Sequence, residues 1–172
     1  MLGFWFGRRP NANVHVKKMA AKFRSRLWAL RHLKNAGMEV EDLKKIYISV
    51  VLPVLDFACP TYHPLLSQTQ TDLLESLQKR ASKIIFGFGS SYRDLIARGK
   101  LQLLEERRKN LCLNFAKKAS TDSRFADKWF PLRPKTLHNT RNPEKYIVDR
   151  PRTERMKKNP VMYMRHALNK LS

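Results

Sequence analysis

Residues 40–64 read VEDLKKIYISVVLPVLDFACPTYHP, and this stretch decides the fold because its middle is almost entirely apolar. On a helical wheel the apolar side chains extend round every face, and a helix that is apolar all round is a buried one. We therefore predict a central core helix here, with Val50 and Val54 inside the protein. Pro53 removes one backbone hydrogen bond and predicts a kink at this point. The run is too short to cross a membrane and Asp56 interrupts it, so no membrane partner is predicted.

Two longer amphipathic helices are predicted to cover this segment. The first is capped by Asn11 or Asn13 and continues until Gly37. Its apolar stripe, which we expect to face the core, consists of Val16, Met19, Phe23, Leu27 and Leu30. The second begins after a capping box that Ser67 forms with Gln70.

Two further helices are predicted in the second half of the chain. A short one, YRDLIAR, is closed by Gly99. The other, over residues 103–120, carries Arg108 within its apolar stripe. A buried guanidinium is costly unless it is paired, so we expect a carboxylate partner, with Asp56 and Glu75 as the alternatives.

The composition is strongly basic, since the 172 residues include 35 Lys and Arg against 14 Asp and Glu, for a formal charge of +21. Such a charge favours nucleic acid or another anionic partner and carries no information on fold. Cys59 and Cys112 lack the paired spacing of a disulfide scaffold or zinc site, which favours a reduced intracellular setting, the nucleus or cytoplasm. The Arg-rich start, without an acid before Glu39, is also typical of a mitochondrial presequence, and that alternative stays open.

The best candidate for a binding surface is a basic ridge on the first long helix. Lys17, Arg24 and Arg31 recur every seven residues on one side of this helix, and Trp28 lies beside them. Such a ridge could follow a phosphate backbone while the aromatic ring meets a sugar or a base. The alternative is a solvated helix face, with Trp28 packed against a neighbouring helix.

Other basic residues extend this candidate surface. A second group of cations lies on one side of the helix that follows Ser67, and two more sets lie further along the chain. The candidates in these groups are Lys79, Arg80, Lys83, Arg107, Arg152 and Arg155. The last two belong to a basic tail that could act as a flexible arm on nucleic acid; a solvated tail is the alternative.

The sequence contains no constellation that predicts catalysis. It has no Gly-rich phosphate loop, no metal-ligand spacing and no pairing of a nucleophile with a base. Its acids are too few and too dispersed to hold two metal ions for phosphoryl transfer. We therefore expect no enzyme activity, no cofactor and no metal site in this chain.

Six segments in a fixed order carry a resemblance to a known family. In chain order they are LGFWF, RLWALRHLKNAGM, EDLKKIYISVVLPVLDFACPTYHP, LESLQKRASKIIFG, LQLLEERRKNLCLNFAKK and RPRTERMKKNPVMYMRHALN. This order closely resembles the C-terminal part of the reverse transcriptases of LINE-type, non-LTR retrotransposons, especially the jockey-like group. The likeness extends over nearly the whole chain, from Leu2 to Leu171.

The resemblance implies a fragment of an RNA-directed DNA polymerase. Such proteins resemble a right hand, and LGFWF looks like the last strand leaving the palm. The helices that follow look like the thumb and post-thumb region, which grips the RNA–DNA duplex. The palm with its paired catalytic aspartates, the fingers and the endonuclease would lie upstream, so the family's catalytic residues have no matching positions here. The resemblance therefore implies binding of RNA, DNA or their hybrid without polymerisation, and the missing palm and fingers as a further partner.

The resemblance and the helical pattern together predict a mainly α fold in three parts. These are a remnant strand at 1–10, a helical thumb-like domain at 11–131, and a basic tail at 132–172 that is partly extended or disordered. Two other interpretations stay open. One is a domesticated helical interaction or scaffold protein whose charge serves solubility only, and the other is a relic without a selected function.

Overall fold

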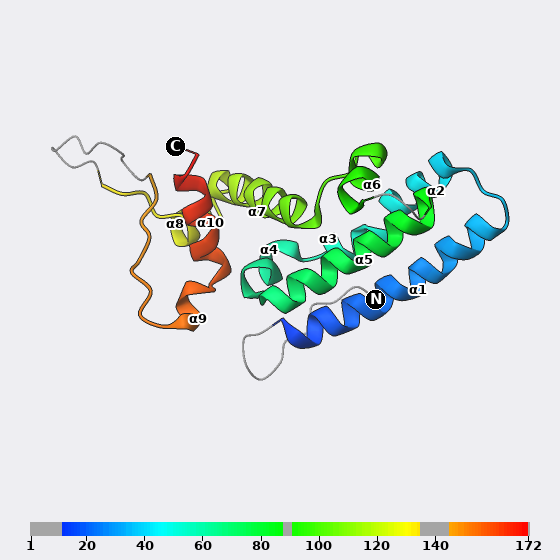
Figure 1. The fold of residues 1–172 in the computed structure, drawn as a ribbon. Coiled ribbons are helices and arrows are strands. Elements are labelled where there is room, and N and C mark those ends of the chain that lie inside the picture. Colours follow the sequence, from blue (N-terminus) through cyan, green and yellow to red (C-terminus); the bar gives the residue numbers. More distant parts are fainter. Residues whose placement is uncertain (1–11, 88–90, 135–144, 172) are drawn as a thin grey trace. The chain divides into compact units, whose positions relative to one another are not determined.

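A computed structural model of the chain describes residues 12–87, 91–134 and 145–171. These residues are mainly helical and contain no β-strand, which confirms the predicted fold class (Figure 1). They form two compact units. The first comprises the residues up to Cys59 and Leu66–Arg108, and the second comprises Pro60–Leu65 and the residues from Lys109 onward. The predicted strand at residues 1–10 lies outside the described part of the chain.

The first unit is built on two long helices, α1 (Asn13–Asn35) and α5 (Gln68–Phe86), which lie side by side (Figure 1). The predicted apolar stripe of α1 is buried, and each of its five side chains is at most 4% exposed: Val16, Met19, Phe23, Leu27 and Leu30. Burial of such a stripe is the main source of stability for an amphipathic helix. Gly37, with φ of +88°, follows the end of α1 as predicted.

Short polar contacts define the starts of these two helices. The capping box is confirmed, because Ser67 Oγ accepts from the Gln70 backbone N–H at 3.3 Å and Gln70 Oε1 accepts from the Ser67 N–H at 2.9 Å. The prediction that Asn13 caps α1 is wrong, since Ala12 occupies the cap position. The Asn13 side chain instead accepts a hydrogen bond from Gln70 Nε2 at 2.5 Å, which ties the start of α1 to the start of α5. Asn11, the other predicted cap, lies outside the described residues.

The central segment is a broken helix rather than one continuous helix. It consists of α2 (Val40–Ile46), the π-helical turn η1 (Tyr47–Val51), α3 (Pro53–Asp56), α4 (Cys59–Tyr62) and the 3₁₀ turn η2 (His63–Leu65). Pro53 cannot donate to the carbonyl group of Ser49, four residues earlier. The helix widens just before it, and the Leu52 N–H donates to the Tyr47 carbonyl at 2.8 Å, a π-type bond. A π turn therefore precedes Pro53, and the predicted kink at this point stays a prediction.

The π turn changes which side chains of this segment are buried. Val54 is buried as predicted, together with Tyr47, Val51, Leu52 and Leu55. The prediction that Val50 is buried is wrong, because Val50 is 49% exposed and Ile48 is 43% exposed. One extra residue per turn rotates the side chains that precede Pro53 relative to those that follow it. In the first unit, α2, η1 and α3 pack against α1, and α2 also packs against α5, while Ile48 and Val50 remain open to solvent.

The short helix α6 (Tyr92–Gly99) ends differently from the prediction. Gly99 belongs to the helix, and Lys100 takes the left-handed conformation after it, with φ of +50°. A Cβ atom at Gly99 would lie 2.7 Å from Cζ of Phe86, so any other residue would have to displace the Phe86 ring. The left-handed position, which glycine usually occupies, therefore falls to a residue with a side chain.

Replacing Lys100 with glycine is expected to stabilise the first unit by about 0.5–1 kcal/mol, because a left-handed backbone is strained for residues with a Cβ. The free energy of unfolding from a urea titration measures this change. Arg98→Gly is the matched control, since Arg98 is also exposed but lies inside α6, where glycine costs about 1 kcal/mol. A loss of stability in Lys100→Gly equal to that in Arg98→Gly would contradict the prediction.

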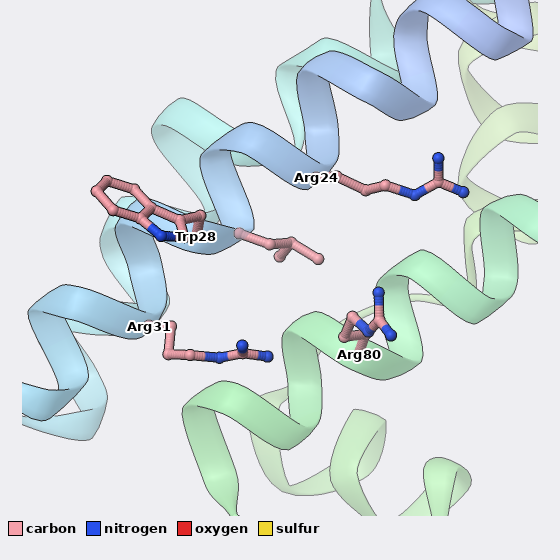
Figure 2. A pocket seen from close by; sticks show the side chains of 5 residues that line it. Arg24, Trp28, Arg31 and Arg80 are labelled. Carbon is pink, nitrogen blue, oxygen red and sulfur yellow. The ribbon is translucent and has the colours of Figure 1, made fainter.

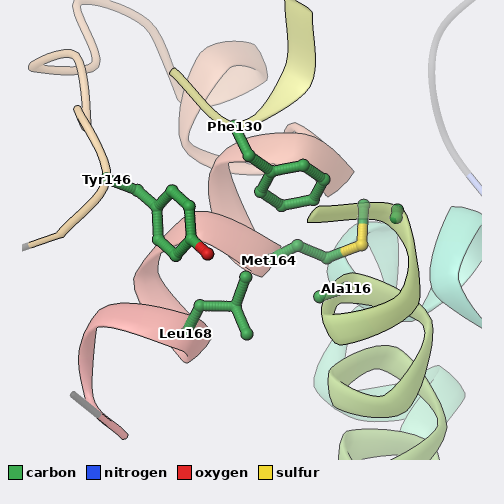
Figure 3. Close-up of a cluster of buried hydrophobic side chains, with 6 residues drawn as sticks. Ala116, Phe130, Tyr146, Met164 and Leu168 are labelled. Carbon is green, nitrogen blue, oxygen red and sulfur yellow. The ribbon is translucent and has the colours of Figure 1, made fainter. Parts of the chain in front are cut away.

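The second unit contains the part of α7 (Leu104–Thr121) from Lys109 onward, together with α8 (Ala126–Trp129), α9 (Glu154–Lys157) and α10 (Pro160–Asn169). These elements enclose a small apolar core. Figure 3 shows this core, which is formed by Ala116, Ala119, Phe130, Tyr146, Met164 and Leu168. The Phe130 and Tyr146 rings meet edge to face, with centroids 5.8 Å apart.

Polar side chains of α10 hold the neighbouring chain segments of this unit. The Asn169 side chain accepts from the Tyr146 N–H at 2.9 Å and donates to the Tyr146 carbonyl at 3.0 Å. Arg165 donates from Nε to the Trp129 carbonyl at 2.6 Å and from one terminal nitrogen to the Ile147 carbonyl at 3.2 Å. Residues 145–171 thus pack with residues 109–130 in one unit, whereas the sequence predicts a boundary at residue 131.

Candidate nucleic-acid interface

The first unit has a cationic pocket on its surface, between α1 and α5. A hollow of about 110 Å³ is lined by Arg24, Leu27, Trp28, Arg31 and Arg80, and we call it the arginine pocket. Figure 2 shows Arg24 and Arg31 extending from α1, and Arg80 extending from α5, into the space between the two helices. Four of the sequence-predicted binding residues therefore meet at one place, and two of the predicted basic groups contribute to it.

Helix periodicity explains why the two α1 arginines meet there. Seven residues make nearly two turns, so Arg24 and Arg31 project from the same side of α1, next to the buried stripe. Leu27 belongs to that stripe and is only 4% exposed, so it forms the apolar base of the pocket. Lys17 continues the ridge two turns earlier and is exposed, but it does not line the pocket.

The three arginines of the pocket lack counter-charges. Within the described residues, Arg24, Arg31 and Arg80 form no hydrogen bond and no ion pair. Guanidinium groups keep their charge at any physiological pH. Three of them around one hollow repel one another and favour an anion between them, most of all one with several oxygen acceptors.

Arg107 does not join this surface, because its guanidinium group is bound to Asp56. Its Nε lies 3.0 Å from Asp56 Oδ1, and a terminal nitrogen lies 2.7 Å from Oδ2. This two-pronged hydrogen bonding raises the pKa of Arg107. The side chain links α7 to the central segment, and its predicted contact with phosphate stays a prediction.

The remaining candidate cations are not part of the arginine pocket. Lys79 is exposed beside Arg80, and Lys83 is partly buried further along α5. Arg152 is exposed in the second unit. Arg155 lies in α9, and its side chain is outside the described part of the structure.

The structure also reveals an aromatic contact that the sequence analysis missed. His32, one turn after Trp28 on α1, packs against the indole with ring centroids 3.9 Å apart and an interplanar angle of 61°. The four-residue spacing of the two rings is the signal that could have predicted this contact. The indole is 64% exposed, so it does not pack under a neighbouring helix of the described chain.

Glu75 organises a partly buried polar network in the first unit. The Arg108 side chain is 2% exposed, and a terminal nitrogen lies 3.8 Å from Glu75 Oε1, which confirms Glu75 as its carboxylate partner. This distance is too long for a hydrogen bond, and the three Arg108 guanidinium nitrogens are buried without hydrogen-bond partners among the described residues. The same oxygen accepts from the Glu105 backbone N–H at 2.8 Å, at the start of α7. The Tyr92 hydroxyl lies 2.8 Å from Glu75 Oε2. Burial and the nearby Glu75 carboxylate raise the pKa of Tyr92, so its hydroxyl stays protonated and can donate.

These contacts assign structural roles to the two acids that the sequence singles out. Asp56 pairs with Arg107, and Glu75 pairs with Arg108. Among the described residues, no group of three or more His, Cys, Asp or Glu side chains could hold a metal ion. No helix in the same residues has the length and apolar character needed to cross a membrane.

Comparisons of the chain with protein-family models, with curated proteins and with solved structures found no match. The resemblance to LINE-type reverse transcriptases therefore stays a prediction from the order of segments.

Proposed function

We propose that the chain binds nucleic acid through its phosphates and without sequence preference, as a thumb-like region of a LINE-type reverse transcriptase. The observation that carries this proposal is the arginine pocket, in which three unpaired arginines from two helices surround one hollow. The formal charge of +21 supports it, because such an excess attracts polyanions from any direction.

The chemistry of the pocket fits a phosphodiester group. A guanidinium group can donate two parallel N–H bonds to two phosphate oxygens, and arginine is suited to this planar contact. Arg24 and Arg31 approach from α1 while Arg80 approaches from α5, so one backbone segment could contact both helices. Contacts to phosphate fix the position of a strand and carry no base information, which explains why the binding would ignore sequence.

The proposal includes no catalytic step by this chain. The family's catalytic aspartates have no matching positions, and two acids of the first unit, Asp56 and Glu75, serve as partners of Arg107 and Arg108. We therefore expect RNA, DNA or an RNA–DNA hybrid as the ligand and no primer extension by the purified chain with magnesium and a template. A palm and fingers part of a reverse transcriptase is proposed as a protein partner of the chain.

The dependence of binding on salt tests the proposal. An RNA–DNA hybrid with a fluorescent label is titrated with the chain at about 50 mM and about 200 mM salt, and Kd is read from fluorescence anisotropy. Neutralisation of three phosphates predicts that Kd rises roughly 40-fold between these two conditions. Hybrids of unrelated sequence should give the same Kd.

Two results would count against nucleic-acid binding. Absence of binding at about 50 mM salt would favour the alternative of a helical scaffold protein. A Kd that differs strongly between unrelated hybrids would show readout of base edges, which the arginine pocket does not provide.

A further inference from the structure

Trp28 presents an aromatic surface beside the arginine pocket. Its side chain is 64% exposed, the largest exposed fraction among the large apolar side chains of the described residues. His32 packs against the indole, so a second ring supports it on the exposed side of α1. An accessible aromatic ring next to unpaired cations is the combination that binds single-stranded nucleic acid.

The position of Trp28 relative to the arginines suits one nucleotide strand. On α1 the indole lies about 40° around the axis from Arg24, on the side away from the buried stripe. In Figure 2 the indole extends away from Arg80, whereas the Arg24 and Arg31 side chains extend toward α5. The phosphate and the base of a nucleotide likewise extend from opposite sides of the sugar. A strand that crosses α1 can therefore place a phosphate in the pocket and a base over the indole.

We infer that Trp28 stacks on an unpaired base of a strand whose phosphate occupies the arginine pocket. This inference rests on the proposed function. It narrows the proposed ligand from nucleic acid in general to single-stranded RNA or DNA, or the unpaired end of a duplex. In a continuous duplex each base face is covered by the next base pair, so an indole beside the backbone has no face to stack on. Arginine contacts to phosphate, in contrast, are available in both forms.

The test compares Trp28→Leu and Trp28→Phe with the parent chain on two ligands. The first is a labelled single strand of about 12 nucleotides, within the size range that aromatic binding grooves accept. The second is a relaxed, covalently closed circular duplex, in which every base is paired, used as an unlabelled competitor. Trp129→Phe, in the second unit, is the matched control for loss of an indole. Circular dichroism and the unfolding midpoint check that each variant folds.

Trp28→Leu should bind the single strand about tenfold more weakly than the parent chain, and Trp28→Phe should lose less because it keeps a ring. In both variants the Kd for the closed duplex, obtained from the competition, should stay within about twofold of that of the parent chain. The slope of log Kd against log salt should also stay constant, because no phosphate contact is lost. The parent chain should bind a strand of abasic sugars about as weakly as Trp28→Leu binds the intact strand. Quenching of indole fluorescence by the intact strand should disappear in Trp28→Leu and persist in Trp129→Phe.

Other outcomes overturn the inference in distinguishable ways. If Trp28→Leu binds the single strand as well as the parent does, or loses affinity equally for both ligands, base stacking is excluded while phosphate binding stands. If the parent chain binds neither ligand at low salt, the proposed function fails and the inference fails with it.

Discussion

Glu75→Ala is expected to lower the free energy of unfolding of the first unit by about 3–5 kcal/mol, because it leaves a buried guanidinium without its counter-charge. Arg108 is 2% exposed, and its carboxylate neighbour is Glu75, at 3.8 Å. The substitution also removes the acceptor for the Glu105 N–H at the start of α7 and a partner of the Tyr92 hydroxyl. Chemical denaturation followed by circular dichroism measures the loss.

Three further variants separate these contributions. Glu106→Ala is the matched control, because Glu106 lies next to Glu105 in the first turn of α7 and is exposed. Its loss should cost at most about 0.5 kcal/mol. Glu75→Gln keeps an oxygen acceptor for α7 and removes only the charge, so its cost should be intermediate. The double variant Glu75→Leu with Arg108→Leu should recover much of the stability, because apolar side chains can replace a buried ion pair. A Glu75→Ala variant as stable as Glu106→Ala would show that Arg108 needs no partner.

Local signals in the sequence predict the long helices and much of the candidate site. The stripe from Val16 to Leu30 repeats with the helical period, and the Ser67 capping box is a two-residue pattern with a direct physical meaning. The arginine ridge on α1 follows from the same period. Arg80 lies beside Arg24 and Arg31 only because α1 packs against α5, and this tertiary contact cannot be predicted from the helical period.

The features that the sequence predicts poorly depend on interactions with neighbouring residues that a local pattern does not contain. Val50 is apolar enough for a core position, yet the π turn before Pro53 directs it to solvent. Gly99 has the usual signal of a helix end, yet the Phe86 ring occupies the space where its Cβ would be. Arg107 and Arg108 are adjacent and chemically identical, and only the positions of Asp56 and Glu75 decide that both serve the fold.

Hydrogen-bond and carboxylate partners distinguish the cations that stabilise the fold from the cations that are free to bind a ligand. In the sequence, Arg165 is one of many cations in a basic tail. In the structure it is buried and donates to the Trp129 and Ile147 carbonyls. Charge alone thus cannot identify a binding surface in a chain with 35 Lys and Arg. Among the described residues, Arg24, Arg31 and Arg80 are exposed, have no carboxylate partner and line one hollow together.

Replacing all three of these arginines with glutamine is expected to weaken binding of an RNA–DNA hybrid on the order of 100-fold at about 50 mM salt. Each substitution keeps a polar side chain of similar length and removes a charge-assisted contact to phosphate. The slope of log Kd against log salt should fall by about 2–3, since roughly that many counterion releases are lost. Fluorescence anisotropy over a salt series measures both quantities.

A triple variant with the same charge loss separates a specific pocket from a general electrostatic attraction. Arg93→Gln, Arg98→Gln and Lys100→Gln remove three exposed cations from α6 and its end, in the same unit, and leave the arginine pocket unchanged. Because long-range attraction between exposed charges is screened within about 10 Å at moderate salt, this variant should lose less than about fivefold in affinity. Equal losses in the two triple variants would mean that nucleic acid senses only the total charge, and the α1–α5 pocket would then have no special part in binding.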